Sequence, residues 1–308
     1  KKENSDNEKS AAVETTAGGA PRPEAVERTL QQRGSMLLGK GKWVIDPTTS
    51  WAHFSSNKIN LQGVVILDVF TIGLIGAQEI NRDIFVQSLG IKYGLLNNLQ
   101  AEMKIPFRSQ YERVTSINAS NVPTDEITRS SAGLGDIDLS MSRQIGWEEG
   151  WKPDLIAAVG FKTRTGDSYG HDIAFGSGHY GLRTALIASK SSDPAVIFGS
   201  LSYTHNFERT DIEGLGDIKP GDVVGYSIGT AIALSYQTAI NFSFDNSVVM
   251  KTVRNGVNVL DSFVNTANFR TGLNWAIDER KSVNVSVSLG LTKDSPDVTV
   301  DVGVPISF

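Results

Sequence analysis

Apolar and polar side chains alternate along much of the chain from Trp43 to Phe308, most regularly near the C-terminus. Between residues 297 and 308, valine, isoleucine and phenylalanine take every second position, and threonine, aspartate, glycine, proline and serine fill the others. Residues 282–293, 264–277 and 239–252 carry the same alternation. A period of two predicts β-strands that have one apolar face and one polar face.

Short turn signals between these segments predict the number of strands. They are LNN (96–98), GWEEGW (146–151), SSDP (191–194), YQT (236–238) and ERK (279–281), with longer links between them. Short turns that alternate with long loops, and an even strand count, are typical of outer-membrane barrels. The sequence therefore predicts an all-β fold, a transmembrane antiparallel β-barrel of about twelve strands over residues 43–308. The predicted strands are 43–56, 82–95, 99–116, 134–145, 153–167, 180–190, 195–209, 223–235, 239–252, 264–277, 282–293 and 297–308.

One apolar segment, Gly63–Gly76, stands outside this set of strands. It contains VVILDVFTIGLIG at 64–76 and could be taken for another strand. An additional strand would make the count odd and leave the C-terminus on the wrong side of the membrane. We therefore assign this segment to the first outer hairpin.

The first 42 residues lack the period of two. Residues 1–20 are mostly small or charged, and such a composition cannot bury enough apolar surface to offset the entropy lost on ordering. They are predicted to form a disordered periplasmic tail. Residues 21–42 are predicted to form a short helix and a linker, since Pro23 suits a first helical turn and Gly34 suits the position after the last.

This predicted helix is polar, because only Val26 and Leu30 share an apolar face. Neither burial in an apolar core nor stability in isolation is expected of it. Twelve tilted strands about 4.7 Å apart close into a backbone cylinder roughly 24 Å across, which leaves a lumen on the order of 10 Å, close to the width of one helix. The helix is therefore predicted to plug the lumen. Its plug residues are Glu24, Glu27, Arg28, Gln31, Gln32 and Arg33.

The polar faces of the predicted strands line the lumen with charges of both signs. Selectivity for one ion sign should therefore be modest, and some of the charges are expected to form salt bridges that stiffen the wall. Arg28, Gln31, Gln32 and Arg33 are predicted to contact lumen acids such as Asp136, Asp138 and Asp301. The predicted pore-lining residues are Lys92, Glu102, Lys104, Arg108, Asp136, Asp138, Lys162, Arg164, Arg183, Asp245, Arg270 and Asp301.

Composition narrows the choice of function classes. The chain has no uninterrupted apolar run of about eighteen residues, so a helical membrane protein is not expected. The net charge of −5 argues against a nucleic-acid partner, and the absence of cysteine removes thiol chemistry and disulfides. A soluble β-sandwich remains the alternative fold, but it would have to cover many apolar strand faces.

Candidate catalytic and metal-binding residues are scarce. The four histidines, His53, His171, His179 and His205, are scattered and form no HExxH motif. His171 and His179 share one predicted outer loop, where solvated side chains are favoured over a metal site. We expect no enzymatic activity, no metal and no cofactor.

Two segments resemble a known family. IKYGLLNNLQAEMKIPFR (91–108) and AGLGDIDLSMSRQI (132–145) are similar to outer-membrane channels associated with the meta-pathway of phenol degradation. Within that superfamily, EAVERTLQQRGSMLLGKGKWVIDP (24–47) followed by TSWAHFSSN looks like the pore of the Fap functional-amyloid secretion system. That resemblance implies a trimeric twelve-stranded barrel, plugged by its N-terminal helix, which exports unfolded amyloid subunits. The terminal Phe308 resembles the signal that the barrel-assembly machinery recognises in its clients.

The sequence thus leads to one main hypothesis and one alternative. The main hypothesis is a gated secretion pore for amyloid subunits in the bacterial outer membrane, a homotrimer surrounded by lipid, with a periplasmic N-terminus. An extended chain could pass the emptied lumen whereas a folded domain could not. The alternative is a passive uptake channel for small aromatic or apolar compounds.

Overall fold

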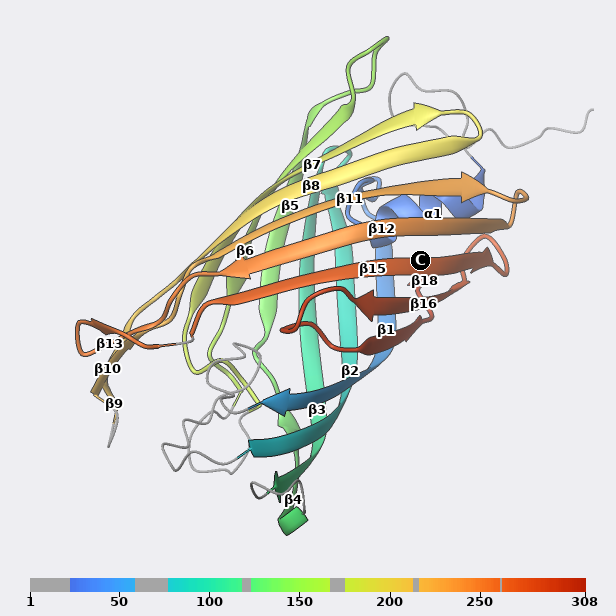
Figure 1. The fold of residues 1–308 in the computed structure, drawn as a ribbon. Coiled ribbons are helices and arrows are strands. Elements are labelled where there is room, and N and C mark those ends of the chain that lie inside the picture. The colour runs from blue at the N-terminus through green and yellow to red at the C-terminus, as the bar shows by residue number, and fades with distance from the viewer. Residues whose placement is uncertain (1–22, 59–76, 118–122, 167–174, 213–215, 261) are drawn as a thin grey trace, which may run out of the picture.

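A computed structural model describes residues 23–58, 77–117, 123–166, 175–212, 216–260 and 262–308 of the chain. In these residues one antiparallel sheet closes on itself into a barrel (Figure 1). The barrel has twelve strands, here called staves because two of them are each interrupted and carry two strand labels. The predicted fold class is confirmed. In order, the staves are β1 (Trp43–Lys58), β2 (Ala77–Leu96), β3 (Leu99–Ile117), β4 (Pro123–Leu134) with β5 (Asp138–Gly146), β6 (Asp154–Lys162), β7 (Gly181–Ser192), β8 (Ala195–Asn206), β11 (Val223–Ala233), β12 (Thr238–Val249), β15 (Val264–Ala276), β16 (Ser282–Gly290), and β17 (Val298–Gly303) with β18 (Ile306–Ser307).

The two ends of the barrel sequence close the sheet. β1 pairs with β2 on one side and with β17 and β18 on the other, so that Trp51 lies opposite Val300. At the end of this seam the Trp43 N–H donates to the Phe308 carbonyl at 3.2 Å, and the Phe308 N–H donates to the Trp43 carbonyl at 2.9 Å. Closure leaves no open sheet edge, which is what a lipid environment requires of a β-structure.

Each of the twelve predicted strands overlaps one stave, but the long loops hold more structure than the sequence predicted. Most of β4 falls within the predicted loop 117–132 and pairs with β3 to form a longer hairpin, and β6 ends at Lys162 rather than at 167. A separate four-stranded sheet joins β9 (Arg209–Ile212), β10 (Gly216–Lys219), β13 (Val253–Arg254) and β14 (Val257–Asn258). The predicted tail 1–20 and the segment Gly63–Gly76 lie outside the described residues.

The two faces of the wall differ as the alternation predicts. On β8, Ile197 and Leu201 are 51% and 58% exposed on the outer face, whereas Val196 and Phe198 are each 4% exposed on the inner face. Exposed aromatic residues gather near both ends of the staves, which is the arrangement of membrane-interface girdles. They include Trp43, Trp147, Trp151 and Trp275 near the short turns and Tyr180, Tyr203 and Tyr226 near the long loops.

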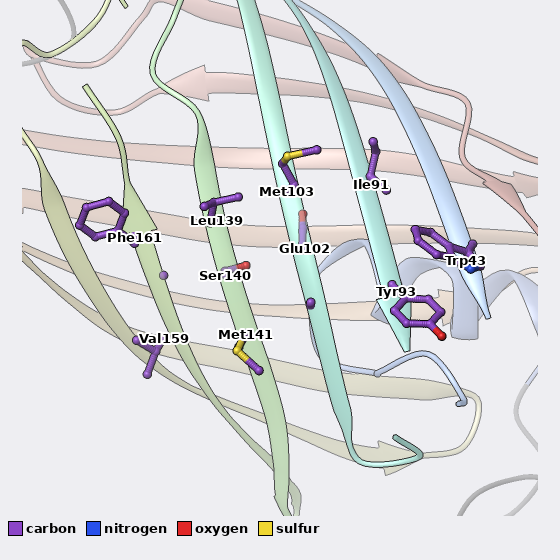
Figure 2. A pocket seen from close by; sticks show the side chains of 12 residues that line it. Trp43, Ile91, Tyr93, Glu102, Met103, Leu139, Ser140, Met141, Val159 and Phe161 are labelled. Atoms are coloured by element: carbon purple, nitrogen blue, oxygen red, sulfur yellow. The ribbon is translucent and has the colours of Figure 1, made fainter. Parts of the chain in front are cut away.

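A shallow groove of about 500 Å³ crosses the outer wall from β1 to β6 (Figure 2). Its walls are apolar and aromatic, with Trp43 and Tyr93 in contact at 4.2 Å between ring centroids. The outer wall is therefore suited to contact with acyl chains along this arc. The remaining side chains on its surface include Ile91, Met103, Leu139, Met141, Val159 and Phe161.

The helix α1 (Glu24–Gln32) ends as the sequence predicts. Gly34 has a φ of +70°, which favours glycine, and the Ser35 N–H donates to the Leu30 carbonyl at 2.8 Å. The Gly34 N–H donates to the Gln31 carbonyl at 3.2 Å, which completes a Schellman motif. No helix in the described part of the chain is long and apolar enough to cross a membrane.

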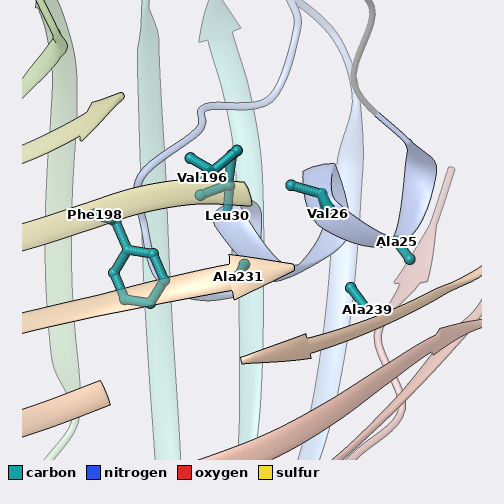
Figure 3. Packing of buried hydrophobic residues seen from close by; sticks show 7 residues of the cluster. All are labelled: Ala25, Val26, Leu30, Val196, Phe198, Ala231 and Ala239. Atoms are coloured by element: carbon teal, nitrogen blue, oxygen red, sulfur yellow. The ribbon is translucent and has the colours of Figure 1, made fainter. Parts of the chain in front are cut away.

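The expectation that α1 would avoid an apolar core is wrong. Val26 and Leu30 are 1% and 0% exposed and pack against Val196, Phe198 and Ala231 (Figure 3). Ala25 and Ala239 belong to the same cluster. The wall of the lumen is therefore not uniformly polar, because β8, β11 and β12 present an apolar patch to the helix.

Candidate functional site: a helix docked in the lumen

The helix α1 and its linker contact staves on several sides of the barrel. The Ala25 N–H donates to the Tyr236 carbonyl at 3.2 Å, and Lys92 Nζ donates to the Gln31 carbonyl at 3.3 Å. Farther along, Ser189 Oγ donates to the Ser35 carbonyl at 3.3 Å. These partners belong to β2, β7 and the turn before β12, so α1 lies within the ring of staves (Figure 1). All of them lie near the short turns, which places the helix at that end of the lumen.

The linker after α1 follows the wall back to β1. The Leu38 N–H donates to Gln100 Oε1 at 3.0 Å, and the Lys40 N–H donates to Asn97 Oδ1 at 3.2 Å. The Gly41 N–H donates to the Gly94 carbonyl at 2.7 Å. These bonds fix the linker to the β2–β3 turn, so the helix enters the lumen from a defined point.

Arg33 makes the main polar contact between the helix and the wall. Its guanidinium donates to Asn241 Oδ1 at 3.2 Å and to Ser243 Oγ at 3.0 Å, and it lies 3.9 Å from the Asp245 carboxylate. It also lies over the Phe198 ring, 5.6 Å from the centroid. Bonds to a charged donor contribute about 1.5–3 kcal/mol each, so Arg33 is a substantial anchor.

The acids around the helix match those that the sequence predicted only in part. Arg33 contacts Asp245 rather than Asp136 or Asp138. Asp301 accepts from Ser50 Oγ at 2.6 Å and lies 3.4 Å from Arg270, which also lies 3.7 Å from Asp245. Asp301 is nevertheless close enough to Arg33 to interact with it electrostatically. The prediction failed for Asp136 and Asp138 because the alternation of side chains gives the face of a residue but not its height along the barrel.

The other predicted plug residues have different surroundings. Arg28 contacts Glu24 at 3.3 Å within the helix and donates to Ser307 Oγ and to the Glu279 carbonyl. Gln31 contributes its backbone carbonyl to Lys92, whereas Gln32 is exposed. Glu27 is partly buried. Arg28 therefore ties the start of α1 to the last stave and to the β15–β16 turn.

The inner wall on β15, which α1 contacts, and on the neighbouring β16 has buried amide groups without hydrogen-bond partners in the protein. Asn274 on β15 and Asn284 on β16 lie opposite each other and are 1% and 5% exposed. Neither amide group makes a hydrogen bond within the protein. The hydroxyl oxygens of Ser282 and Ser35 are also buried without a hydrogen-bond partner. Each such group costs about 1–3 kcal/mol when it loses water. The apolar patch stabilises docking of α1, and the buried amide of Asn274 on β15, which α1 contacts, opposes docking.

The remaining predicted pore-lining residues have three kinds of surroundings. Lys104, Asp138 and Arg183 are exposed, and Glu102 is partly buried. In register, Lys104 lies beside Asp138, and Asp138 lies beside Lys162. Arg108, Asp136 and Lys162 instead contact residues of the long loop 163–180. Arg164 lies beyond the end of β6, with its guanidinium 5.2 Å from the centroid of the Tyr180 ring.

Sequence reasoning missed several residues of this site. Phe198, Asn241, Ser243 and Gln100 all contact α1 or its linker, although none carries an obvious chemical signal. Phe198 has the inward parity of β8, so an apolar residue at a lumen-facing position could have indicated a docking patch. Among the described residues, no cluster of three or more histidine, aspartate or glutamate side chains could hold a metal ion.

Comparison with solved structures agrees with this architecture. The chain is similar to the COG4313 outer membrane channel from Pseudomonas putida F1, with a TM-score of 0.64 and 13% identity over 89% of this chain and 97% of that chain. It is also similar to the translocator domain of the autotransporter NalP from Neisseria meningitidis, with a TM-score of 0.51 and 12% identity over 91% of this chain and 94% of that chain. At these identities the likeness shows the fold.

The family is shown by a profile match instead. Residues 90–308, which include eleven of the twelve staves in whole or in part, match a family described as "Putative MetA-pathway of phenol degradation". The match covers well over half of the chain and includes both segments on which the wider resemblance rested. The chain therefore belongs to this family of the putative MetA-pathway of phenol degradation.

Proposed function

We propose that this chain is an outer-membrane channel for the passive uptake of small molecules, with its short turns and α1 on the periplasmic side. The observation that carries the proposal is a closed barrel with an apolar outer wall and a charged lumen that is partly filled by a helix. A lumen on the order of 10 Å admits small solutes when the helix is undocked, and it admits no folded protein.

The family description suggests aromatic compounds as the substrate class. The exposed inner-wall charges Lys104, Asp138 and Arg183 would suit aromatic solutes that also carry hydroxyl or carboxylate groups. Such solutes cross lipid slowly and gain most from a water-filled route. Because these wall charges are of both signs, a solute should pass without being held strongly at one site, where tight binding would slow its release.

The helix gives this channel a partly closed resting state. Its apolar contacts with Phe198 and its anchor at Arg33 stabilise docking, whereas the buried amide of Asn274 opposes docking. Because these terms oppose each other, docked and undocked helices can exchange. The channel would then open without any large change in the barrel wall.

Flux into proteoliposomes tests the uptake proposal. Liposomes that contain the purified chain should admit a hydroxylated aromatic carboxylate faster than protein-free liposomes do, and a chain that lacks α1 should admit it faster still. Equal flux in protein-containing and protein-free liposomes would exclude a channel. A requirement for an energy source would exclude passive uptake.

A second candidate is the export of unfolded amyloid subunits. The docked α1 favours it, since a removable helix about as wide as the lumen could give way to one extended chain. The comparisons support the wider channel family and give no support to an amyloid system, so this candidate rests on the N-terminal resemblance. Surface amyloid that disappears on deletion of the gene and returns on its re-expression would favour export over uptake.

The homotrimer and the role of Phe308 in assembly remain predictions.

A further inference from the structure

We propose that residues 175–179, here called the lining segment, narrow the pore at the long-loop end and limit the size of the solutes that pass. This inference rests on the proposed channel function. The lining segment is distinct from α1, which contacts the wall near the short turns. The pore would therefore contain two restrictions in series, one at each end of the barrel.

The lining segment lies on the inner face of the wall. Gly133 on β4 is opposite Arg108 on β3, and Arg108 shares the lumen-facing parity of Gln100, which binds the α1 linker. A Cβ atom at Gly133 would stand 2.6 Å from the Phe175 ring, and Arg108 donates to the Phe175 carbonyl at 3.4 Å. Phe175 is 5% exposed, so its ring is packed against the lumen side of β3 and β4.

Asp136 holds the lining segment in this position. Its carboxylate accepts from the Ser177 N–H at 2.7 Å, from Ser177 Oγ at 2.6 Å and from the Gly166 N–H at 3.0 Å. Three donors on one buried carboxylate form charge-assisted bonds, which are about twice as strong as neutral ones. Gly176 allows the close approach, because a Cβ atom there would stand 2.5 Å from Asp136 Oδ1. Asp136 is thus a positioning residue for the segment.

Contacts at the other end of the lining segment complete its attachment. Lys162 Nζ lies 3.1 Å from His179 Nε2, and His179 Nδ1 lies 2.7 Å from the Ser177 carbonyl. Arg209 on β9 donates to the Gly178 carbonyl at 3.2 Å. The segment therefore bridges the β4–β5 corner, the end of β6 and the start of β9 on one side of the pore.

A chain layer attached to one wall reduces the open cross-section substantially. Packed layers lie at most about 10 Å apart, and the backbone cylinder is roughly 24 Å across, so the segment occupies a large share of the lumen at its level. Releasing the segment should raise single-channel conductance roughly two-fold and admit larger sugars, if it blocks about half of that cross-section.

The experiment releases the lining segment in two independent ways. Asp136→Ala removes its anchor, and Gly133→Val places a side chain where the Phe175 ring lies. Asp222→Ala is the matched control, because Asp222 also accepts several bonds, from Tyr203 and Asn206, but on the outward side of β8. Single-channel conductance and the largest sugar admitted by proteoliposomes are measured in the full chain and again with Leu30→Asp, which removes the restriction by α1.

Both Asp136→Ala and Gly133→Val should raise the conductance and the sugar limit, whereas Asp222→Ala should leave them unchanged. If either variant folds into a heat-modifiable barrel and behaves like the control, the inference is wrong. A chain that conducts in neither background would instead overturn the proposed channel function. The two failures are therefore distinguishable.

Discussion

Replacing Leu30 by alanine should undock α1 from the lumen. Leu30 is fully buried among Val26, Val196 and Phe198 in the docked state, and it loses these contacts when the helix leaves. Truncation of a buried leucine costs about 2–5 kcal/mol, and each 1.4 kcal/mol is about a factor of ten in an equilibrium constant. The ratio of undocked to docked helices should therefore rise between roughly 30-fold and several thousand-fold.

Single-channel recording in planar bilayers measures this ratio as the fraction of time spent in the high-conductance state. Gln32→Ala is the control on the same helix, because Gln32 is exposed and its truncation removes no buried contact. Leu30→Ala should convert rare openings into frequent or permanent ones, and Gln32→Ala should behave like the unchanged chain.

A substitution that is expected to lower the open fraction, rather than raise it, strengthens the test. Asn274→Ala removes a buried amide that has no hydrogen-bond partner within the protein. Docking should become more favourable by about 1–3 kcal/mol, which lowers the open fraction by roughly 5-fold to 150-fold. Equal open fractions in Leu30→Ala, Asn274→Ala and the unchanged chain would refute the reasoning, since they would show that helix docking does not limit the pore.

Three further outcomes are expected. Burial, with help from the nearby Lys162, lowers the pKa of His179, which lies outside the spanning strands, to about 4. Because a released histidine has a pKa near 6.5, attachment of the lining segment should be fully present above about pH 6.5 and progressively lost toward pH 4, which conductance against pH can follow. Glu112→Ala should lower barrel stability by about 3–5 kcal/mol in denaturant titrations, because it leaves Arg82 unpaired on the inner wall, whereas an unchanged midpoint would contradict this. Deletion of Phe308 should slow assembly into the outer membrane in cells, and normal amounts of folded barrel there would argue against its role as a signal.

The staves could be predicted from the sequence because their cause is local. Lipid on one side and water on the other impose a period of two on each stave. This period is clearest in the four C-terminal strands, and the short turn signals placed the others. The end of α1 was equally predictable, since Gly34 adopts the positive φ that the last turn requires. By contrast, β4 was missed because its sequence, PTDEITRSSAGL, carries no apolar alternation and pairs with β3 mostly beyond the apolar band.

The chain's own pattern thus determined a closed barrel, its turns and a short polar helix before β1. Only the tertiary structure decided where that helix docks and which loop turns inward. Val26 and Leu30 are too few to predict burial, and they become a core only because β8 and β11 bring Phe198 and Ala231 to the same height. Likewise, the sequence predicts Asp136 only as a pore-lining acid, and the folded loop is what brings Ser177 Oγ within 2.6 Å of it. Height along the barrel depends on stagger between staves, which is a property of the whole sheet and of no single strand.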